Sequence, residues 1–185
     1  DVPPVDRRRA ADDLSAIRLL LDRILDQAER GRLLRTGVRL AIVGSPNVGK
    51  SSLLNALLRS DRAIVTDIPG TTRDTLEEQF DLEGVPVAVV DTAGIRGTVD
   101  SVESEGIARS RRALAEADVA LLVFDAGREL DDADNAVVGI VREYGLPVLT
   151  VLNKSDLPEQ TGHRDLAALG IGGTAVPTCA LNDAG

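Results

Sequence analysis

Hydrophobic residues in this chain fall into short continuous runs, separated by stretches with helical spacing. The clearest runs occupy residues 40–43, 119–124 and 147–152. Continuous aliphatic runs of this length are typical of parallel strands that are buried on both faces of a sheet. The stretches between them that have helical spacing lie at residues 50–59, 103–117 and 130–144.

Three further strands are expected. Residues 75–82 and 85–90 are joined by Glu83-Gly84 and predict a hairpin, and residues 175–178 predict a last strand. Alternating strands and helices imply an open sheet covered on both faces. We therefore predict an α/β, doubly wound fold with a mostly parallel six-stranded sheet and one antiparallel strand.

An amphipathic helix is predicted before the sheet, over residues 6–30. Its apolar positions share one face, and they are Leu14, Ile17, Leu21, Ile24 and Ala28. Gly31 is the expected C-cap. A single helix cannot bury its apolar stripe alone. We expect this one to pack on the following domain, on a domain outside this sequence, or on another copy.

The composition of the chain bears on whether it binds nucleic acid broadly, whether its compartment is reducing, and whether it crosses a membrane. The net charge of −9 and the presence of only three aromatic residues argue against a broad nucleic-acid surface. A lone cysteine, Cys179, cannot form an internal disulfide, which favours a reducing, cytoplasmic location. No apolar run reaches 18 residues, so no transmembrane helix is expected. The chain contains no methionine and is interpreted as part of a longer protein.

A phosphate-binding loop is predicted at Gly44–Ser51. The segment reads G-S-P-N-V-G-K-S and lies between an apolar run and a predicted helix. Its backbone N–H groups and the positive end of the helix suit a phosphate. Lys50 is expected to reach the β- and γ-phosphates, and the Ser51 hydroxyl is expected to ligate magnesium. The alternative is a glycine-rich turn at a helix start.

A guanine-reading loop is predicted at Asn153-Lys154-Ser155-Asp156, which follows a buried strand. The Asp156 carboxylate can accept hydrogen bonds from the ring N–H and the amino group of guanine, whereas adenine would leave it unpaired. The Lys154 stem can cover the base, and Asn153 can tie this loop to the phosphate loop. The alternative is a polar loop at a strand end.

Two segments between these loops have the composition of switches. Asp91-Thr92-Ala93-Gly94 follows a strand and is expected to contact magnesium through water and the γ-phosphate through the Gly94 N–H. Gly70-Thr71-Thr72-Arg73-Asp74 contains threonines that can ligate magnesium when a γ-phosphate is present. The alternatives are an Asp-Gly turn and a turn rich in Ser and Thr.

In this order the motifs resemble the translation-factor-like branch of GTPases, and within it the MnmE (TrmE) family of tRNA uridine-modification GTPases. The resemblance runs from about Leu14 to Gly185 and includes Leu33-Leu34-Arg35, Pro46–Asn55, Ala63–Ile68, Asp91–Arg96 and Glu103–Ile107. The fifth motif, Thr178-Cys179-Ala180-Leu181, departs from the family pattern. The resemblance implies a helical segment of a flanking domain at 1–36 and a GTPase domain at 37–185.

The resemblance also assigns roles to residues. It implies GTP binding by Asn47, Val48, Gly49, Lys50, Ser51, Ser52, Thr66, Asp67, Ile68, Pro69, Gly70, Thr71, Thr72, Asp91, Thr92, Ala93, Gly94, Asn153, Lys154, Asp156, Cys179, Ala180 and Leu181. It assigns magnesium to Ser51 and Thr72, and potassium to Asn47, Thr66, Ile68 and Thr71. Ile95 stands where Ras-like enzymes have a water-orienting glutamine. The catalytic role falls to Glu103, with Glu105 as its competitor.

The family's biology implies partners. Its GTPase domains form a homodimer across their nucleotides, and the full-length protein acts on tRNA with the flavoprotein MnmG and a folate-binding N-terminal domain. Arg73 is expected to stabilise the switch at residues 70–74 (switch I) or the dimer contact. His163 is expected in a surface loop, and Cys179 is expected to be a small residue near the base. Two alternatives stay open: a ribosome-assembly GTPase domain similar to Der or Era, and a GTP-dependent switch that does not hydrolyse GTP.

Overall fold

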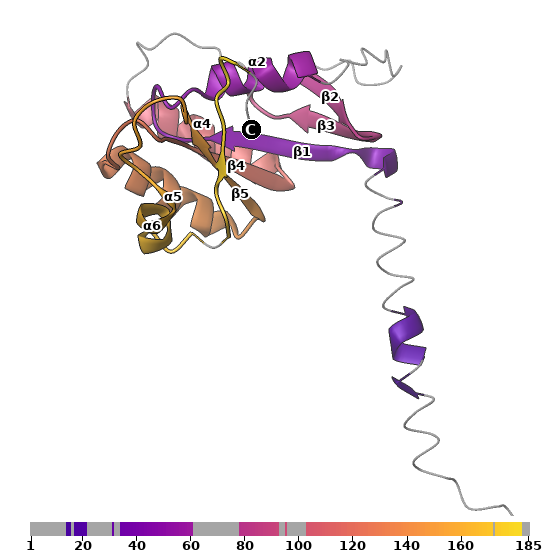
Figure 1. The fold of residues 1–185 in the computed structure, drawn as a ribbon. Helices are drawn as coiled ribbons and strands as arrows, with labels where there is room; N and C mark the ends of the chain where they lie inside the picture. Colours follow the sequence, from indigo (N-terminus) through magenta and orange to yellow (C-terminus); the bar gives the residue numbers. More distant parts are fainter. Residues whose placement is uncertain are drawn as a thin grey trace, which may run out of the picture.

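The computed structural model describes residues 14–15, 17–21, 31, 34–60, 78–92, 95, 103–171 and 173–182, without the side chains of residues 60 and 103–105. Its elements (Figure 1) are β1 (Val38–Val43), α2 (Lys50–Ser60), β2 (Glu78–Leu82), β3 (Val85–Val89), α4 (Glu103–Glu116), β4 (Val119–Asp125), α5 (Asp132–Tyr144), β5 (Val148–Asn153), α6 (His163–Ala168) and β6 (Val176–Pro177).

One six-stranded sheet organises the domain, in the order β2-β3-β1-β4-β5-β6. β2 pairs antiparallel with β3, and the other neighbours are parallel. The predicted fold class is therefore confirmed, including the single antiparallel strand. The register places Val43 beside Leu122, and Asp125 beside Asn153, at the carboxyl ends of β1, β4 and β5. Open α/β sheets bind ligands at this edge.

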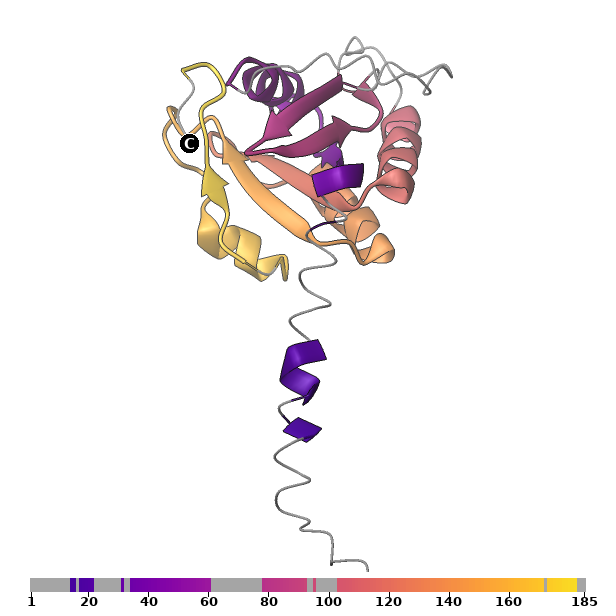
Figure 2. The same ribbon diagram turned by 90° about the vertical axis from the view of Figure 1, so that its right-hand side faces the viewer.

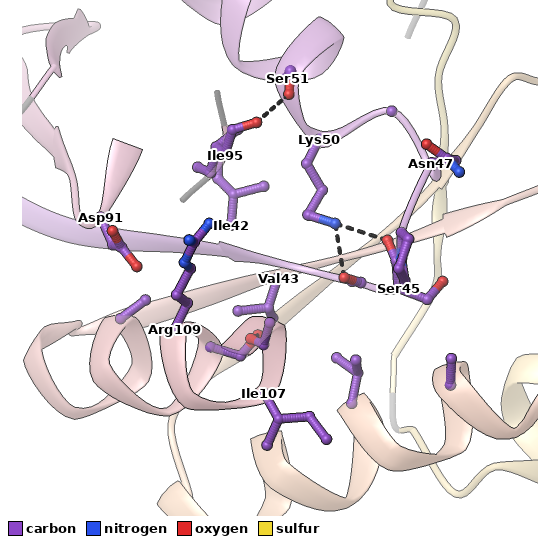
Figure 3. Close-up of a pocket in the computed structure, with 18 of the residues that line it drawn as sticks. Ile42, Val43, Ser45, Asn47, Lys50, Ser51, Asp91, Ile95, Ile107 and Arg109 are labelled. Carbon is purple, nitrogen blue, oxygen red and sulfur yellow. Dashed lines mark hydrogen bonds between the residues drawn. The ribbon is translucent and has the colours of Figure 1, made fainter. Parts of the chain in front are cut away.

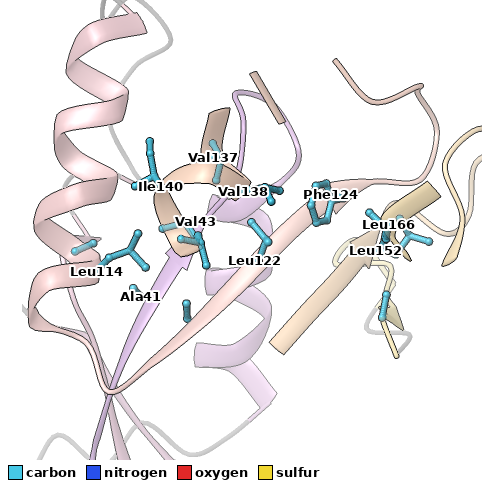
Figure 4. Packing of buried hydrophobic residues seen from close by; sticks show 14 of the residues in the cluster. Ala41, Val43, Leu114, Leu122, Phe124, Val137, Val138, Ile140, Leu152 and Leu166 are labelled. Atoms are coloured by element: carbon cyan, nitrogen blue, oxygen red, sulfur yellow. The ribbon is translucent and has the colours of Figure 1, made fainter. Parts of the chain in front are cut away.

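Helices cover the two faces of the sheet unequally (Figure 2). On one face, Leu114 of α4, Val138 of α5 and Leu166 of α6 pack with Leu122 and Phe124 of β4 (Figure 4). On the other face, α2 packs through two leucines onto β1 and β3. The carboxyl-terminal halves of β1, β4 and β5 are buried on both faces, which is why these strands read as continuous apolar runs in the sequence. The ends of the strands are therefore held rigidly where the loops begin.

The N-terminal segment is helical where it is described, at residues 14–15, 17–21, 31 and 34–36. The predicted apolar face is exposed, with Leu14 at 67%, Ile17 at 56% and Leu21 at 54%. The described side chains of this stripe therefore do not pack on the sheet domain. The prediction that Gly31 ends the helix is wrong, because Gly31 is itself helical. None of the helices in the described part of the chain is long and apolar enough to cross a membrane.

Helix α6 was not predicted. It is six residues long, begins after the extended Gly162 and buries only Leu166. His163 is exposed, but it opens this helix and does not lie in a loop, which corrects that prediction. So short a helix has no second apolar turn, which explains why the hydrophobic pattern does not reveal it.

Candidate nucleotide site at the carboxyl edge of the sheet

The predicted phosphate loop joins β1 to α2 and lines a cavity of about 470 Å³. Backbone geometry keeps the loop close to its neighbours. A Cβ on Gly44 would lie 2.4 Å from the carbonyl oxygen of Val123 in β4. Asn47 has a left-handed φ of 63°, a conformation that asparagine tolerates better than most residues. The glycine and asparagine therefore allow a tight turn around the cavity.

Lys50 folds back over the loop. Its Nζ donates to the carbonyl of Gly44 at 2.8 Å and to that of Ser45 at 2.7 Å (Figure 3). Burial lowers the pKa of Lys50 to about 8, because the charged ammonium loses water. A phosphate placed in the cavity would restore a negative partner to this group.

Two oxygen groups proposed for magnesium face the same cavity. Ser51, in the first turn of α2, and Asp91, which follows β3, both line it. The Ser51 hydroxyl donates to the main-chain carbonyl of Ile95 (Figure 3). Magnesium ligation by Ser51 therefore requires this hydrogen bond to be given up. Asp91 has a left-handed φ of 55°, a conformation that aspartate, like asparagine, tolerates better than most residues.

Ile95 is buried, with 8% of its surface exposed, and belongs to the core cluster on the α2 side of the sheet. An aliphatic side chain in this position cannot orient water. That catalytic help comes from another residue remains a prediction.

Asn153 joins three loops. Its Nδ2 donates to the Val48 carbonyl of the phosphate loop at 2.9 Å. Its Oδ1 accepts from the Thr178 hydroxyl at 3.3 Å and from the Ala180 N–H at 3.4 Å. Only 2% of Asn153 is exposed. The predicted tie between the base-reading loop and the phosphate loop is therefore present, and the degenerate fifth motif shares it.

The Asn153 side chain lies so close to the phosphate loop that position 49 must be a glycine. A Cβ on Gly49 would lie 2.2 Å from Asn153 Nδ2, and the φ of Gly49 is +96°. The glycine of the phosphate-loop pattern therefore serves two purposes here, backbone conformation and space for the amide.

Lys154 and Asp156, which follow β5, differ in their contacts. The Nζ of Lys154 contacts Asp125 Oδ2 at 2.5 Å, and the φ of Lys154 is 62°. Asp156 is exposed, and its carboxylate accepts no hydrogen bond from the described residues. The ion pair directs the lysine stem across the loop and leaves the carboxylate open to a ligand.

Many of the predicted residues lie outside the described part of the chain. They are Thr66, Asp67, Ile68, Pro69, Gly70, Thr71, Thr72, Arg73, Ala93 and Gly94. The main chain of Glu103 and Glu105 starts α4, but their side chains are not described. Cys179 is buried, while Leu181 is 84% exposed. The assignment of these residues to the site remains a prediction.

A family model described as "50S ribosome-binding GTPase" matches residues 39–154, more than half of the chain. The chain belongs to this GTPase family. It is therefore an enzyme domain that hydrolyses GTP, and the matched range includes both the phosphate loop and the strand end at Asn153-Lys154.

Curated relatives similar to this GTPase carry the name tRNA modification GTPase MnmE. That of Synechococcus sp. (strain CC9311) is 53% identical over 85% of this chain and 34% of its own length. That of Thermoanaerobacter sp. (strain X514) is 46% identical over 91% of this chain and 36% of its own length. The chain thus spans about a third of the length of these relatives.

Solved GTPases share the fold. A variant of Aquifex aeolicus Era bound to GDP and AlF4⁻ has a TM-score of 0.55 and 29% identity, covering 80% of this chain and 52% of its own. The FeoB G-domain of Methanococcus jannaschii has a TM-score of 0.54 and 26% identity, covering 80% and 90%.

The sequence did not single out a polar cluster behind the phosphate loop of this GTPase. Arg128, in the loop after β4, forms a two-pronged ion pair with Asp134 of α5. Both residues also hydrogen-bond to the hydroxyl of Ser45. Ser45 precedes Arg128 by 83 residues and Asp134 by 89. No local pattern reveals contacts of that span.

Proposed function

We propose that this chain is the GTPase domain of a protein that modifies tRNA, and that its GTP cycle drives conformational changes for modification of the wobble uridine. The observation that carries the proposal is identity of 46–53% to tRNA modification GTPases named MnmE over most of the chain. Because the match covers only about a third of those relatives, the modification reaction itself would need parts outside this sequence.

In the proposed reaction the phosphate loop holds the triphosphate and Lys50 lies against its β- and γ-phosphates. The hydroxyl of Ser51, with the Asp91 carboxylate across the same cavity, forms an oxygen-rich set that suits magnesium. Thr72 is the proposed second protein ligand. Magnesium, when bound, would supply positive charge to the phosphates. The residues of the chain position the phosphates and the ion.

Potassium is the proposed second cation. Asn47 is exposed at the rim of the cavity, and the other proposed ligands are Thr66, Ile68 and Thr71. Amide, carbonyl and hydroxyl oxygens are donors suited to hard cations. Positive charge there would assist a site that has the buried Ile95 instead of a water-orienting side chain. Glu103 is the proposed residue that orients water.

We further propose that residues 1–36 belong to a flanking helical domain, and that two GTPase domains associate across their nucleotides. The exposed leucines of the N-terminal stripe support a covering partner. In the longer protein, MnmG and tRNA are the proposed partners, and folate belongs to another domain.

A ribosome-assembly role similar to that of Era is less well supported. The Era chain from Aquifex aeolicus is 29% identical to this one, against 53% for the Synechococcus relative. Detection of ribosomal RNA binding by this domain would reverse that order.

The experiment measures GTP turnover in potassium and in sodium over a range of protein concentrations. We expect turnover per molecule to rise with concentration in potassium and to stay low in sodium. ATP serves as the matched control nucleotide. Equal rates in both salts, independent of concentration, would contradict the potassium and dimerisation proposals without affecting the assignment of GTPase activity.

A further inference from the structure

The cluster of Ser45, Arg128 and Asp134 behind the phosphate loop is centred on a buried carboxylate. Asp134 is 1% exposed, and its two oxygens accept four hydrogen bonds. Oδ1 accepts from the Ser45 hydroxyl at 2.6 Å and from Arg128 at 2.9 Å. Oδ2 accepts from Arg128 at 2.7 Å and from the Asp131 N–H at 3.1 Å. A paired, buried carboxylate of this kind fixes geometry strongly, because losing a partner leaves a buried charge.

The Ser45 hydroxyl acts both as a hydrogen-bond donor and as an acceptor within this cluster. It donates to Asp134, and it accepts from Arg128 at 2.7 Å. Ser45 is 2% exposed. The side chain therefore cannot turn without breaking two hydrogen bonds to charged groups, which are stronger than neutral ones.

The main chain of the same residue faces the cavity. The Ser45 carbonyl accepts from Lys50 Nζ at 2.7 Å, on the side from which phosphate would be bound. A fixed Ser45 side chain thus fixes the direction of a carbonyl that holds the ammonium group.

Arg128 and Asp134 do not line the cavity, and other residues hold them in place. Thr161, 1% exposed, donates its hydroxyl to the Arg128 carbonyl at 2.7 Å. Asp134 is the third residue of α5 and forms a capping box with Asp131. The Asp134 side chain is therefore anchored to the start of α5, whereas Thr161 holds the main chain of Arg128 and not its guanidinium group.

We propose that Arg128 and Asp134 are positioning residues for GTP, which act through Ser45 to hold the phosphate loop and Lys50 in a binding-competent arrangement. The proposal rests on the phosphate loop being the GTP site. Preorganisation of this kind raises affinity because less ordering is needed when the ligand binds. Neither residue needs to contact the nucleotide.

The test compares Ser45→Ala and Asp134→Asn with two controls. Asp131→Asn removes another carboxylate partner of Arg128 but keeps an oxygen for the helix cap, and Asp131 does not contact Ser45. Thr161→Val removes a buried hydroxyl from the far side of Arg128. Each variant is measured for the Kd of a fluorescent GTP analogue, for kcat, and for the Tm without nucleotide.

We expect about tenfold weaker GTP binding in Ser45→Ala and in Asp134→Asn, with kcat at saturation changed less than threefold. The double variant should bind no more weakly than the weaker single variant, because both changes break the same link. Asp131→Asn and Thr161→Val should bind within twofold of the unaltered protein, even where Thr161→Val lowers the Tm.

Two results would overturn the proposal. One is that Ser45→Ala and Asp134→Asn bind GTP as tightly as the unaltered protein. The other is that loss of affinity follows loss of Tm across all four variants, which would make the cluster structural only. Failure of the unaltered protein to bind GTP is a different result, because it would count against the phosphate loop as the GTP site.

Discussion

The side-chain amide of Asn153 donates to the main-chain carbonyl of Val48 at 2.9 Å, which joins the base-reading loop to the phosphate loop. The two residues are 105 positions apart in the sequence. Because Asn153 ends β5 and Val48 lies next to α2, one hydrogen bond connects both halves of the site. The same Asn153 side chain also positions the loop that contains Thr178 and Ala180, because both residues donate hydrogen bonds to its Oδ1.

Replacing Asn153 by Ala should weaken GTP binding by at least about tenfold, because buried groups on both loops lose their partner. The free energy of unfolding should fall by about 1–3 kcal/mol for the same reason. Binding of a fluorescent GTP analogue and urea unfolding measure the two effects. Asn182→Ala, an exposed asparagine in the same C-terminal segment, is the control and should change neither. Unchanged GTP binding in Asn153→Ala would show that the tie has no role in nucleotide binding.

Replacing Gly49 by Ala should remove most GTP binding. The new Cβ would lie 2.2 Å from Asn153 Nδ2, and the φ of +96° disfavours any L side chain. Gly84→Ala is a matched control, since Gly84 has a similar φ of +89° but no atom within 4 Å of an added Cβ. The control should lower stability by about 1–2 kcal/mol from backbone strain and leave GTP binding intact. Equal binding losses in both variants would point to strain alone.

Replacing Asp156 by Asn should relax the preference for guanine. The exposed carboxylate can accept from two guanine N–H groups, and a neutral amide cannot accept from both. We expect GTP affinity to fall about 100-fold, consistent with losing one hydrogen bond to a charged group, which contributes about 1.5–3 kcal/mol. Competition between GTP, ATP and XTP measures the change. Glu159→Gln, an exposed carboxylate on the same loop, should leave the order of affinities unchanged.

These contacts show which parts of the site the sequence predicts. The phosphate loop and the base-reading loop are local patterns at the ends of apolar runs, so their place at one edge of the sheet follows from the strand order. The link through Asn153 was also anticipated. The cluster of Ser45, Arg128 and Asp134 was not, because its members are separated by many residues and match no motif. Tertiary packing alone brings them together.

The N-terminal segment shows a different limit of sequence reasoning. Periodic spacing predicts a helix correctly where the structure describes it, since spacing reports local conformation. Spacing does not report what covers the apolar face, and Leu14 and Ile17 remain more than half exposed. Gly31 shows that a glycine within a helical pattern is not always a cap, because glycine also occurs inside helices at some loss of stability.

Replacing Glu103 by Ala should lower kcat about 100-fold, the lower range of what a positioned acid–base group contributes. GTP affinity should stay within twofold, because the proposed role concerns water and not the nucleotide. Glu105→Ala is the paired variant at the start of the same helix. Single-turnover hydrolysis in potassium distinguishes the two residues. A larger loss in Glu105→Ala than in Glu103→Ala would transfer the proposed role to Glu105.

Raising the pH should weaken GTP binding through Lys50. Burial lowers the pKa of this lysine to about 8, below its usual 10.5, whereas phosphates in the complex raise it again. Below pH 8 the ammonium already carries its proton. Above pH 8 binding must take up a proton, and the affinity should fall about eightfold between pH 7.5 and pH 9. The free energy of unfolding should instead rise with pH over this range, because the folded chain loses this proton before the unfolded chain does.

Titration of GTP affinity at constant ionic strength measures this dependence. Lys50→Arg is the control, because a guanidinium keeps its charge over the whole range. Ionisation of the guanine ring near pH 9 affects both proteins equally, so the ratio of their affinities isolates the lysine. We expect that ratio to fall with pH, with its midpoint near the pKa of Lys50. A ratio that stays constant from pH 7.5 to pH 9 would mean that the lysine is fully protonated without nucleotide and that the two loop carbonyls outweigh its burial.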